Sequence, residues 1–87
     1  MKTIAQLIIG IDGQAKFDAM SARAGMTPEE CAAATHLQGL AASMTAEHRA
    51  VLADPAKGKA AIARVALLPA GDDVQDRFAR TLAAILN

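Results

Sequence analysis

Three side chains of this sequence belong to types that commonly bind metals or act as nucleophiles: Cys31, His36 and His48. A structural zinc site usually needs four such ligands in closely spaced pairs, which this set does not supply. Cys31 lies in the first turn of an expected helix, where a thiol pKa can be lowered. No glycine-rich approach that could form an oxyanion hole adjoins it. We therefore expect no metal and no catalytic residue, with Cys31 a small buried apolar side chain and His48 facing solvent.

Two glycine patterns fall short of nucleotide-binding motifs. The Gly-Lys pair at 58–59 lacks the first glycine and the hydroxyl residue of a phosphate-binding loop, since alanines stand at both places. The segment 10–13 lacks the third glycine of a dinucleotide-binding fingerprint. The paired carboxylates at 29–30 and 72–73 are explained by helix capping and the helix dipole. The sequence thus predicts no cofactor and no general acid or base.

The formal net charge is zero, which argues against a general nucleic-acid binder because such proteins neutralise phosphates. One local concentration of basic residues exists, formed by Arg49, Lys57, Lys59 and Arg64 with Asp54 opposing it. This group is our candidate interaction surface for an anionic contact on a protein or a nucleic acid. A solvated helix face is the alternative explanation for the same residues.

The segment 25–37 resembles the first helix of a helix-turn-helix unit, with Cys31 and Ala32 at its apolar and alanine positions. The resemblance then weakens. His36 stands where the tight turn usually has glycine, and residues 36–45 contain no Lys, Arg or Asn to contact bases or phosphates. DNA binding through the unit at 27–45, or through the basic segment 49–64, is therefore the alternative function.

Composition favours helices. Alanine, the best helix former, supplies 22 of the 87 residues, and only two residues are aromatic. A chain of this length has room for one core, so we expect a single helical domain over residues 1–87. The single cysteine excludes an internal disulfide, and no apolar stretch is long enough to cross a membrane. A cytoplasmic protein without membrane contact is the expectation.

Capping patterns divide the chain into helices. Four of them combine an N-cap residue with a supporting residue behind it, and they begin at Thr3, Thr27, Asp54 and Asp72. Thr45 is a weaker start. We therefore predict an all-α fold, a compact bundle of about five or six short helices at residues 4–11, 13–24, 28–43, 46–53, 56–68 and 73–86.

Apolar residues at helical spacing give each predicted helix an inward face. From the third helix to the last, these faces are Ala33, Leu37, Leu40 and Met44; Val51 and Leu52; Ile62, Val65, Ala66 and Leu68; and Val74, Phe78, Leu82 and Ile85. The stripe of the last helix is the most regular of them. We therefore expect Phe78 at the centre of the core.

Residues 7–17 allow two structures. Asp12-Gly13 between apolar residues is a strong signal for a β-hairpin turn. The helical alternative places Ile4, Leu7, Ile8, Ile11, Ala15, Asp18, Ala19 and Ala22 on one stripe, with a kink or break at Gly10 and Gly13. We prefer the helix because the cap at Thr3 agrees with the stripe, and because an isolated hairpin would need a partner surface.

With no chemistry assigned, recognition by surface is the function that the sequence favours. We expect a small non-catalytic protein–protein interaction module, that is, an adaptor, regulator or inhibitor that docks on a larger protein. The four methionines supply adaptable apolar side chains of a kind that binding surfaces use. A homodimer is also possible, since small helical domains often bury excess apolar surface in that way.

Overall fold

The computed structural model describes all 87 residues. The chain forms six α-helices and one turn of 3-10 helix, which confirms the predicted all-α bundle. The helices are α1 (Ile4–Asp12), α2 (Gln14–Ala24), α3 (Pro28–Gly39), α4 (Ala46–Ala53), α5 (Pro55–Leu67) and α6 (Val74–Ile85), with the 3-10 turn at Ala41–Ser43. Five of the six agree with the predicted ranges to within one residue. α3 is shorter than predicted, because the chain leaves the α-helix after Gly39 and continues as the 3-10 turn.

Side-chain caps fix where the helices begin. Thr3 and Thr27 each form a complete capping box, and Asp54 accepts from the backbone N–H groups at the start of α5. These three predicted starts are confirmed. Thr45, the weaker start, also forms a complete box, in which His48 is the supporting side chain.

The predicted cap at Asp72 is wrong by one residue. Asp73 is the N-cap of α6, and its carboxylate accepts from the backbone N–H groups of Gln75 at 2.8 Å and Asp76 at 3.2 Å. Asp73 has the extended backbone of an N-cap residue. The box that starts at Asp72 therefore does not form.

No hairpin forms at residues 7–17, where α1 and α2 meet at Gly13, so the preferred helical prediction is confirmed. Gly13 has a φ of 100°, a conformation that residues with a side chain rarely adopt. The change of direction there divides the predicted stripe. Ala15, Ala19 and Ala22 are exposed, and Phe17 is the buried residue of α2 instead.

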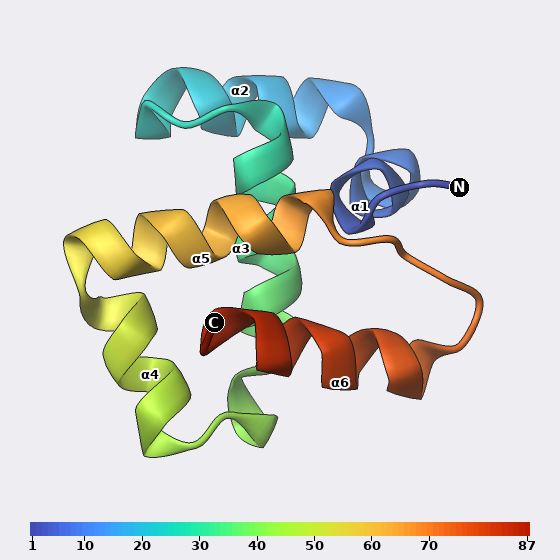
Figure 1. Cartoon of the computed structure of the whole chain (residues 1–87). Coiled ribbons are helices and arrows are strands. Elements are labelled where there is room, and N and C mark those ends of the chain that lie inside the picture. The colour runs from blue at the N-terminus through green and yellow to red at the C-terminus, as the bar shows by residue number, and fades with distance from the viewer.

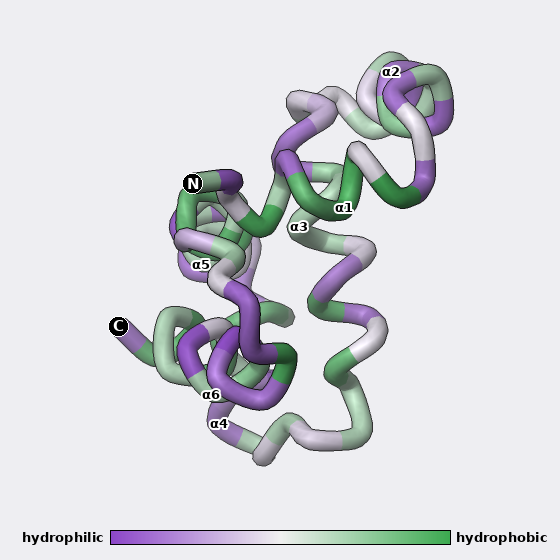
Figure 2. The backbone as a smooth tube through the Cα atoms, turned by 90° about the vertical axis from the view of Figure 1, so that its right-hand side faces the viewer, coloured by the Kyte–Doolittle hydropathy of each residue, from purple (hydrophilic) through white to green (hydrophobic).

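α3 crosses α2 and α5 at a steep angle (Figure 1). α3 runs through the middle of the molecule and packs against α1, α2 and α5. α5 and α6 lie side by side, and α4 packs against both of them. Figures 1 and 2 both place α2 at the opposite end of the molecule from α4 and α6.

The core is built largely from alanine, which supplies seven of its fifteen buried apolar residues. The largest fully buried side chains include Phe17, Ile4, Ile85 and Val65, which come from four different helices. All four residues of the inward face predicted for the third helix are buried, although two of them, Leu40 and Met44, lie beyond the end of α3. Val51, Leu52, Ile62, Leu68 and Leu82 are partly buried and pack against this core.

The prediction that Phe78 lies at the centre of the core is wrong. Its side chain is 38% exposed and Val74 is 51% exposed, whereas Thr81, Ala84 and Ile85 are buried. α6 is therefore rotated so that part of its apolar stripe faces solvent. The small side chains of Thr81 and Ala84 let α6 approach its neighbours, while a phenylalanine at the same place would hold it away.

The first residues of the chain lie against the connection between α5 and α6. The Ile4 N–H donates to the Leu68 carbonyl at 2.8 Å, and the Ala70 N–H donates to the Lys2 carbonyl at 2.8 Å. None of the helices is long and apolar enough to span a lipid bilayer.

Candidate functional site: an apolar groove beside α3

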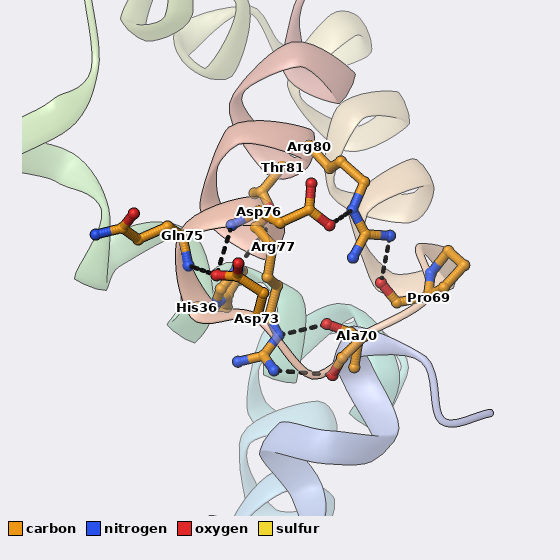
Figure 3. Close-up of polar contacts among 10 residues, drawn as sticks. His36, Pro69, Ala70, Asp73, Gln75, Asp76, Arg77, Arg80 and Thr81 are labelled. Carbon is orange, nitrogen blue, oxygen red and sulfur yellow. Dashed lines mark hydrogen bonds and ion pairs between the residues drawn. The ribbon is translucent and has the colours of Figure 1, made fainter.

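His36 is buried in α3 and lies against α6 (Figure 3). Its Nε2 is 3.1 Å from the Thr81 hydroxyl oxygen, and its ring centroid is 5.9 Å from that of Phe78. Burial lowers the pKa of His36, and the positive charge of Arg77 lowers it further. The geometry therefore assigns His36 to the contact between α3 and α6, as a neutral ring.

His48 is buried as well, at 8% exposed, so the prediction that it faces solvent is wrong. Its Nδ1 accepts from the Thr45 backbone N–H at 3.1 Å, and its Nε2 is 3.1 Å from the Leu82 carbonyl oxygen. The capping box turns the ring back toward the start of α4, and this orientation brings its far nitrogen to α6. His48 therefore joins α4 to α6.

Two arginines of α6 hold the loop that leads into that helix (Figure 3). Arg77 donates to the carbonyls of Ala70 at 2.6 Å and Gly71 at 3.1 Å. Arg80 donates to the Pro69 carbonyl at 3.0 Å and forms an ion pair with Asp76 at 3.0 Å. These side chains donate hydrogen bonds to backbone carbonyls that would otherwise lack a partner.

The four residues of the predicted basic surface differ in what they contact. Arg64 donates to the carbonyls of Ala84 and Ile85 at the end of α6, and Arg49 donates to the Ala41 carbonyl. Lys57 lines the same hollow as Arg64, whereas Lys59 lines a different one. The two lysines are two residues apart in α5, so they point to different faces.

Cys31 is buried, as predicted, with 2% of its surface exposed, and its thiol is free. Burial raises its pKa, and the Glu30 carboxylate raises it further. Both effects act against the lowering of a thiol pKa that a place in the first turn of a helix can produce. A thiol held in its protonated form is a weak nucleophile.

The segment 27–45 does not form the helix-turn-helix unit on which the alternative function depends. α3 continues through His36 to Gly39, and the following residues form a 3-10 turn where a recognition helix would lie. No group of three or more His, Cys, Asp or Glu residues is placed to hold a metal ion.

The best candidate site is an apolar hollow of about 300 Å³ between α3, the 3-10 turn, α4 and α5. Its lining consists of six apolar side chains and one amide: Ala34, Leu37, Ala41, Met44, Leu52, Ile62 and Gln38. Ala41 and Gln38 are exposed, and Leu52 and Ile62 are partly buried. The hollow is open to solvent and its wall is almost entirely aliphatic.

A second hollow of about 320 Å³ shares Leu52 and Ile62 with the first, so the two adjoin. Its lining is more polar and includes Glu30, Asp54 and Lys59. We call the two hollows together the apolar groove, and these three charged residues its polar end. One Glu30 oxygen accepts from the Thr27 N–H, and one Asp54 oxygen caps α5. The polar end carries one more carboxylate than ammonium group.

Sequence reasoning missed this groove because it expected Leu52 and Ile62 in the core, whereas both are only partly buried and line the hollow. A usable signal was present in the third predicted helix and the residue that follows it, residues 28–44, which are apolar on more than one side. Ala34 and Ala41 lie outside the face formed by Ala33, Leu37, Leu40 and Met44. Apolar residues in excess of one core-facing stripe indicate a second contact surface.

The chain matches no known protein family, and neither the curated proteins nor the solved structures include one that is significantly similar to it. The fold and the site thus define it as a small all-α protein with an open apolar groove.

Proposed function

We propose that this protein is a small, non-catalytic interaction module that binds an apolar segment of a partner protein in the groove beside α3. The single observation that carries the proposal is the open, aliphatic hollow of about 300 Å³ bounded by Leu37, Met44, Leu52 and Ile62. Apolar surface that a monomer leaves in a concave site marks a binding surface more often than a flat scatter of apolar residues does.

The chemistry of the lining favours a protein segment over a small molecule. Small-molecule sites usually combine apolar walls with several placed polar groups that fix orientation, and Gln38 is the one polar side chain in this hollow. An amphipathic helix needs no such groups, because its side chains enter a groove at regular spacing. Met44 adds a flexible wall that can adapt to the entering side chain.

The polar end of the groove defines the partner more closely. Two carboxylates, Glu30 and Asp54, lie there with one ammonium group, that of Lys59. A basic residue of the partner helix, next to its apolar side chains, is therefore favoured at the polar end. The expected partner segment is therefore an amphipathic helix with apolar residues on one face and a Lys or Arg toward one end.

Nucleic-acid binding, the alternative function, has less support from the geometry. Arg49 and Arg64 are engaged with backbone carbonyls, and Lys57 and Lys59 face different hollows. A gel-shift experiment on a mixed DNA probe at low salt separates the two functions. A salt-dependent shift that charge reversal at Lys57 and Lys59 abolishes would favour DNA binding.

A random helical-peptide library selected against the full chain tests the proposal. Selected peptides should bind the wild type and lose at least about tenfold in affinity, or ~1.4 kcal/mol, to the Ala41→Arg variant. The matched control is Ala19→Arg, which adds the same charge and bulk at an exposed alanine of α2. An equal loss of peptide affinity in both variants would refute the groove as the site. Chemical-shift changes on peptide binding that centre away from Leu52 and Ile62 would refute it as well.

The same preparation tests the other possible occupant, a second copy of the chain. Sedimentation of the wild type as a 9.0 kDa species at micromolar concentration excludes a homodimer. A dimer that Ala41→Arg dissociates would place the second copy in the groove instead of a foreign helix.

A further inference from the structure

Two of the four basic residues of the predicted interaction surface line a hollow that is separate from the groove beside α3. This hollow has a volume of about 280 Å³ and lies where α4 and α5 meet the end of α6 (Figure 1). Its lining includes two cations and four apolar side chains: Lys57, Arg64, Val51, Ala60, Ile85 and Leu86. No Asp or Glu lines it, in contrast to the polar end of the groove. We call it the basic hollow.

The guanidinium group of Arg64 is held in place by the end of α6. Its Nε donates to the Ala84 carbonyl at 3.0 Å, and its Nη2 donates to the Ile85 carbonyl at 3.3 Å. These two bonds use one edge of the planar group. Nη1 makes no hydrogen bond within the chain and is not a buried atom, so the other edge is open to solvent. The free N–H groups are thus oriented before a ligand arrives, which lowers the entropy lost on binding.

Lys57 lies on the same face of α5 as Arg64, because seven residues make close to two helical turns. Its side chain is exposed, and it forms no ion pair with a carboxylate of the chain. Ala60 lies between these two residues along the face, and its small side chain leaves the space between them open. Both long side chains can therefore turn toward one anion above Ala60.

The surroundings of the two cations favour a carboxylate over a phosphate group. The backbone groups at Arg64 are carbonyls at the end of α6, which carry partial negative charge and cannot donate hydrogen bonds. A phosphate brings about two negative charges and three acceptor oxygens, which need more donors than two side chains supply. The two oxygens of a carboxylate instead match the two N–H groups on one guanidinium edge.

The apolar part of the lining defines what the carboxylate is attached to. Val51, Ile85 and Leu86 are aliphatic and lie beside the two cations. A volume of about 280 Å³ is at the small end of the range for ligand pockets, so the attached apolar group must be short.

We propose that the basic hollow binds a carboxylate that carries a short aliphatic group. The free edge of Arg64 donates two hydrogen bonds to the carboxylate, Lys57 pairs with it, and the aliphatic group packs against Ile85 and Leu86. A free aliphatic acid and the terminal carboxylate of an apolar residue in a partner chain both present this chemistry. The basic hollow is independent of the groove, so it does not depend on the function proposed above.

An NMR titration of the full chain with hexanoate tests the site. The backbone amides of Lys57 and Leu86 and the side-chain N–H groups of Arg64 should shift and saturate, with a Kd in the millimolar range. Acetate, which lacks the aliphatic chain, and hexanol, which lacks the charge, should each bind there at least about tenfold more weakly. Sodium chloride at matched ionic strength is the control for screening.

A parallel titration with N-acetylleucine distinguishes the two sources of the carboxylate. Tighter binding of N-acetylleucine than of hexanoate supports the site and assigns it to the end of a partner chain. Tighter binding of hexanoate supports the site and assigns it to a free aliphatic acid.

A pair of lysine variants supplies the matched comparison. Lys57→Gln should weaken hexanoate binding at least about fivefold, because it removes one of the two cations. Lys59→Gln removes the same charge from the same helix but on the face that lines the groove, so it should leave the affinity unchanged. Three results would overturn the proposal: no saturating shift, equal weakening in the two variants, or shifts that centre on Leu37 and Leu52 of the groove.

Discussion

The two aromatic residues of the chain lie in opposite environments, which gives a direct test of the core at the level of single residues. Phe17 is fully buried and Phe78 is 38% exposed. Phe17→Ala should lower the free energy of unfolding by about 3–5 kcal/mol, enough to unfold much of a domain this small, because it leaves a cavity in the core. Phe78→Ala should cost clearly less. Urea denaturation of both variants measures the difference, and equal losses would contradict the assigned core.

Cys31 supplies a second prediction at the residue scale. Burial and the Glu30 carboxylate raise its pKa, so less thiolate is present at neutral pH and the reagent must also wait for the helix to open. A thiol-specific reagent should modify the folded chain at least about tenfold more slowly than the urea-unfolded chain. The control is glutathione under the same two conditions. A native rate equal to the unfolded rate would mean that Cys31 is accessible.

At the level of helices, two glycines inside helices differ in what surrounds them. A Cβ at Gly58 in α5 would lie 2.6 Å from the Leu52 carbonyl oxygen of α4, whereas a Cβ at Gly10 in α1 would meet nothing within 4 Å. Gly10→Ala should therefore stabilise the fold by about 0.5–1 kcal/mol through helix propensity. Gly58→Ala should destabilise it, because backbone atoms of α4 and α5 would have to separate. Thermal unfolding of the two variants should shift in opposite directions, and two shifts of the same sign would refute the close approach of α4 to α5.

The comparison of helix ends with helix faces shows which features could be predicted from the sequence. The ends were predictable because a cap such as Thr27 with Glu30 is local and satisfies backbone groups within a few residues. The orientation of α6 was not, because it depends on bonds from other helices to Thr81 and Leu82. His48 was misjudged for the same reason: its role in the box at Thr45 is local, but its contact with α6 is between residues 34 positions apart.

At the level of the whole molecule, alanine and polar side chains divide the work of holding the helices. Four of the seven core alanines lie in α3 and α5 and let these two helices approach closely, but each alanine buries little apolar surface. α6 contributes few large apolar side chains to this core, and His36, His48 and Arg64 hold it by hydrogen bonds to its middle and end. The groove beside α3 stays open because α4 and α5 cover only part of the apolar surface of α3.

The stability of the whole molecule should therefore depend on pH in a direction that His36 sets. Its pKa in the folded chain is lowered by burial and then by Arg77, whereas in the unfolded chain it is about 6.5. Below about pH 6.5 the unfolded chain thus binds more protons than the folded chain, so acid favours unfolding. The contribution of the neutral ring is complete above about pH 6.5 and declines, by at most about 1.4 kcal/mol per pH unit, until the folded-state pKa is passed. Urea unfolding at a series of pH values should show this decline in the wild type and a shallower one in His36→Gln, whose side chain does not titrate. Parallel curves for the two proteins, or a wild type that gains stability as pH falls through this range, would contradict a buried neutral His36 at the contact between α3 and α6.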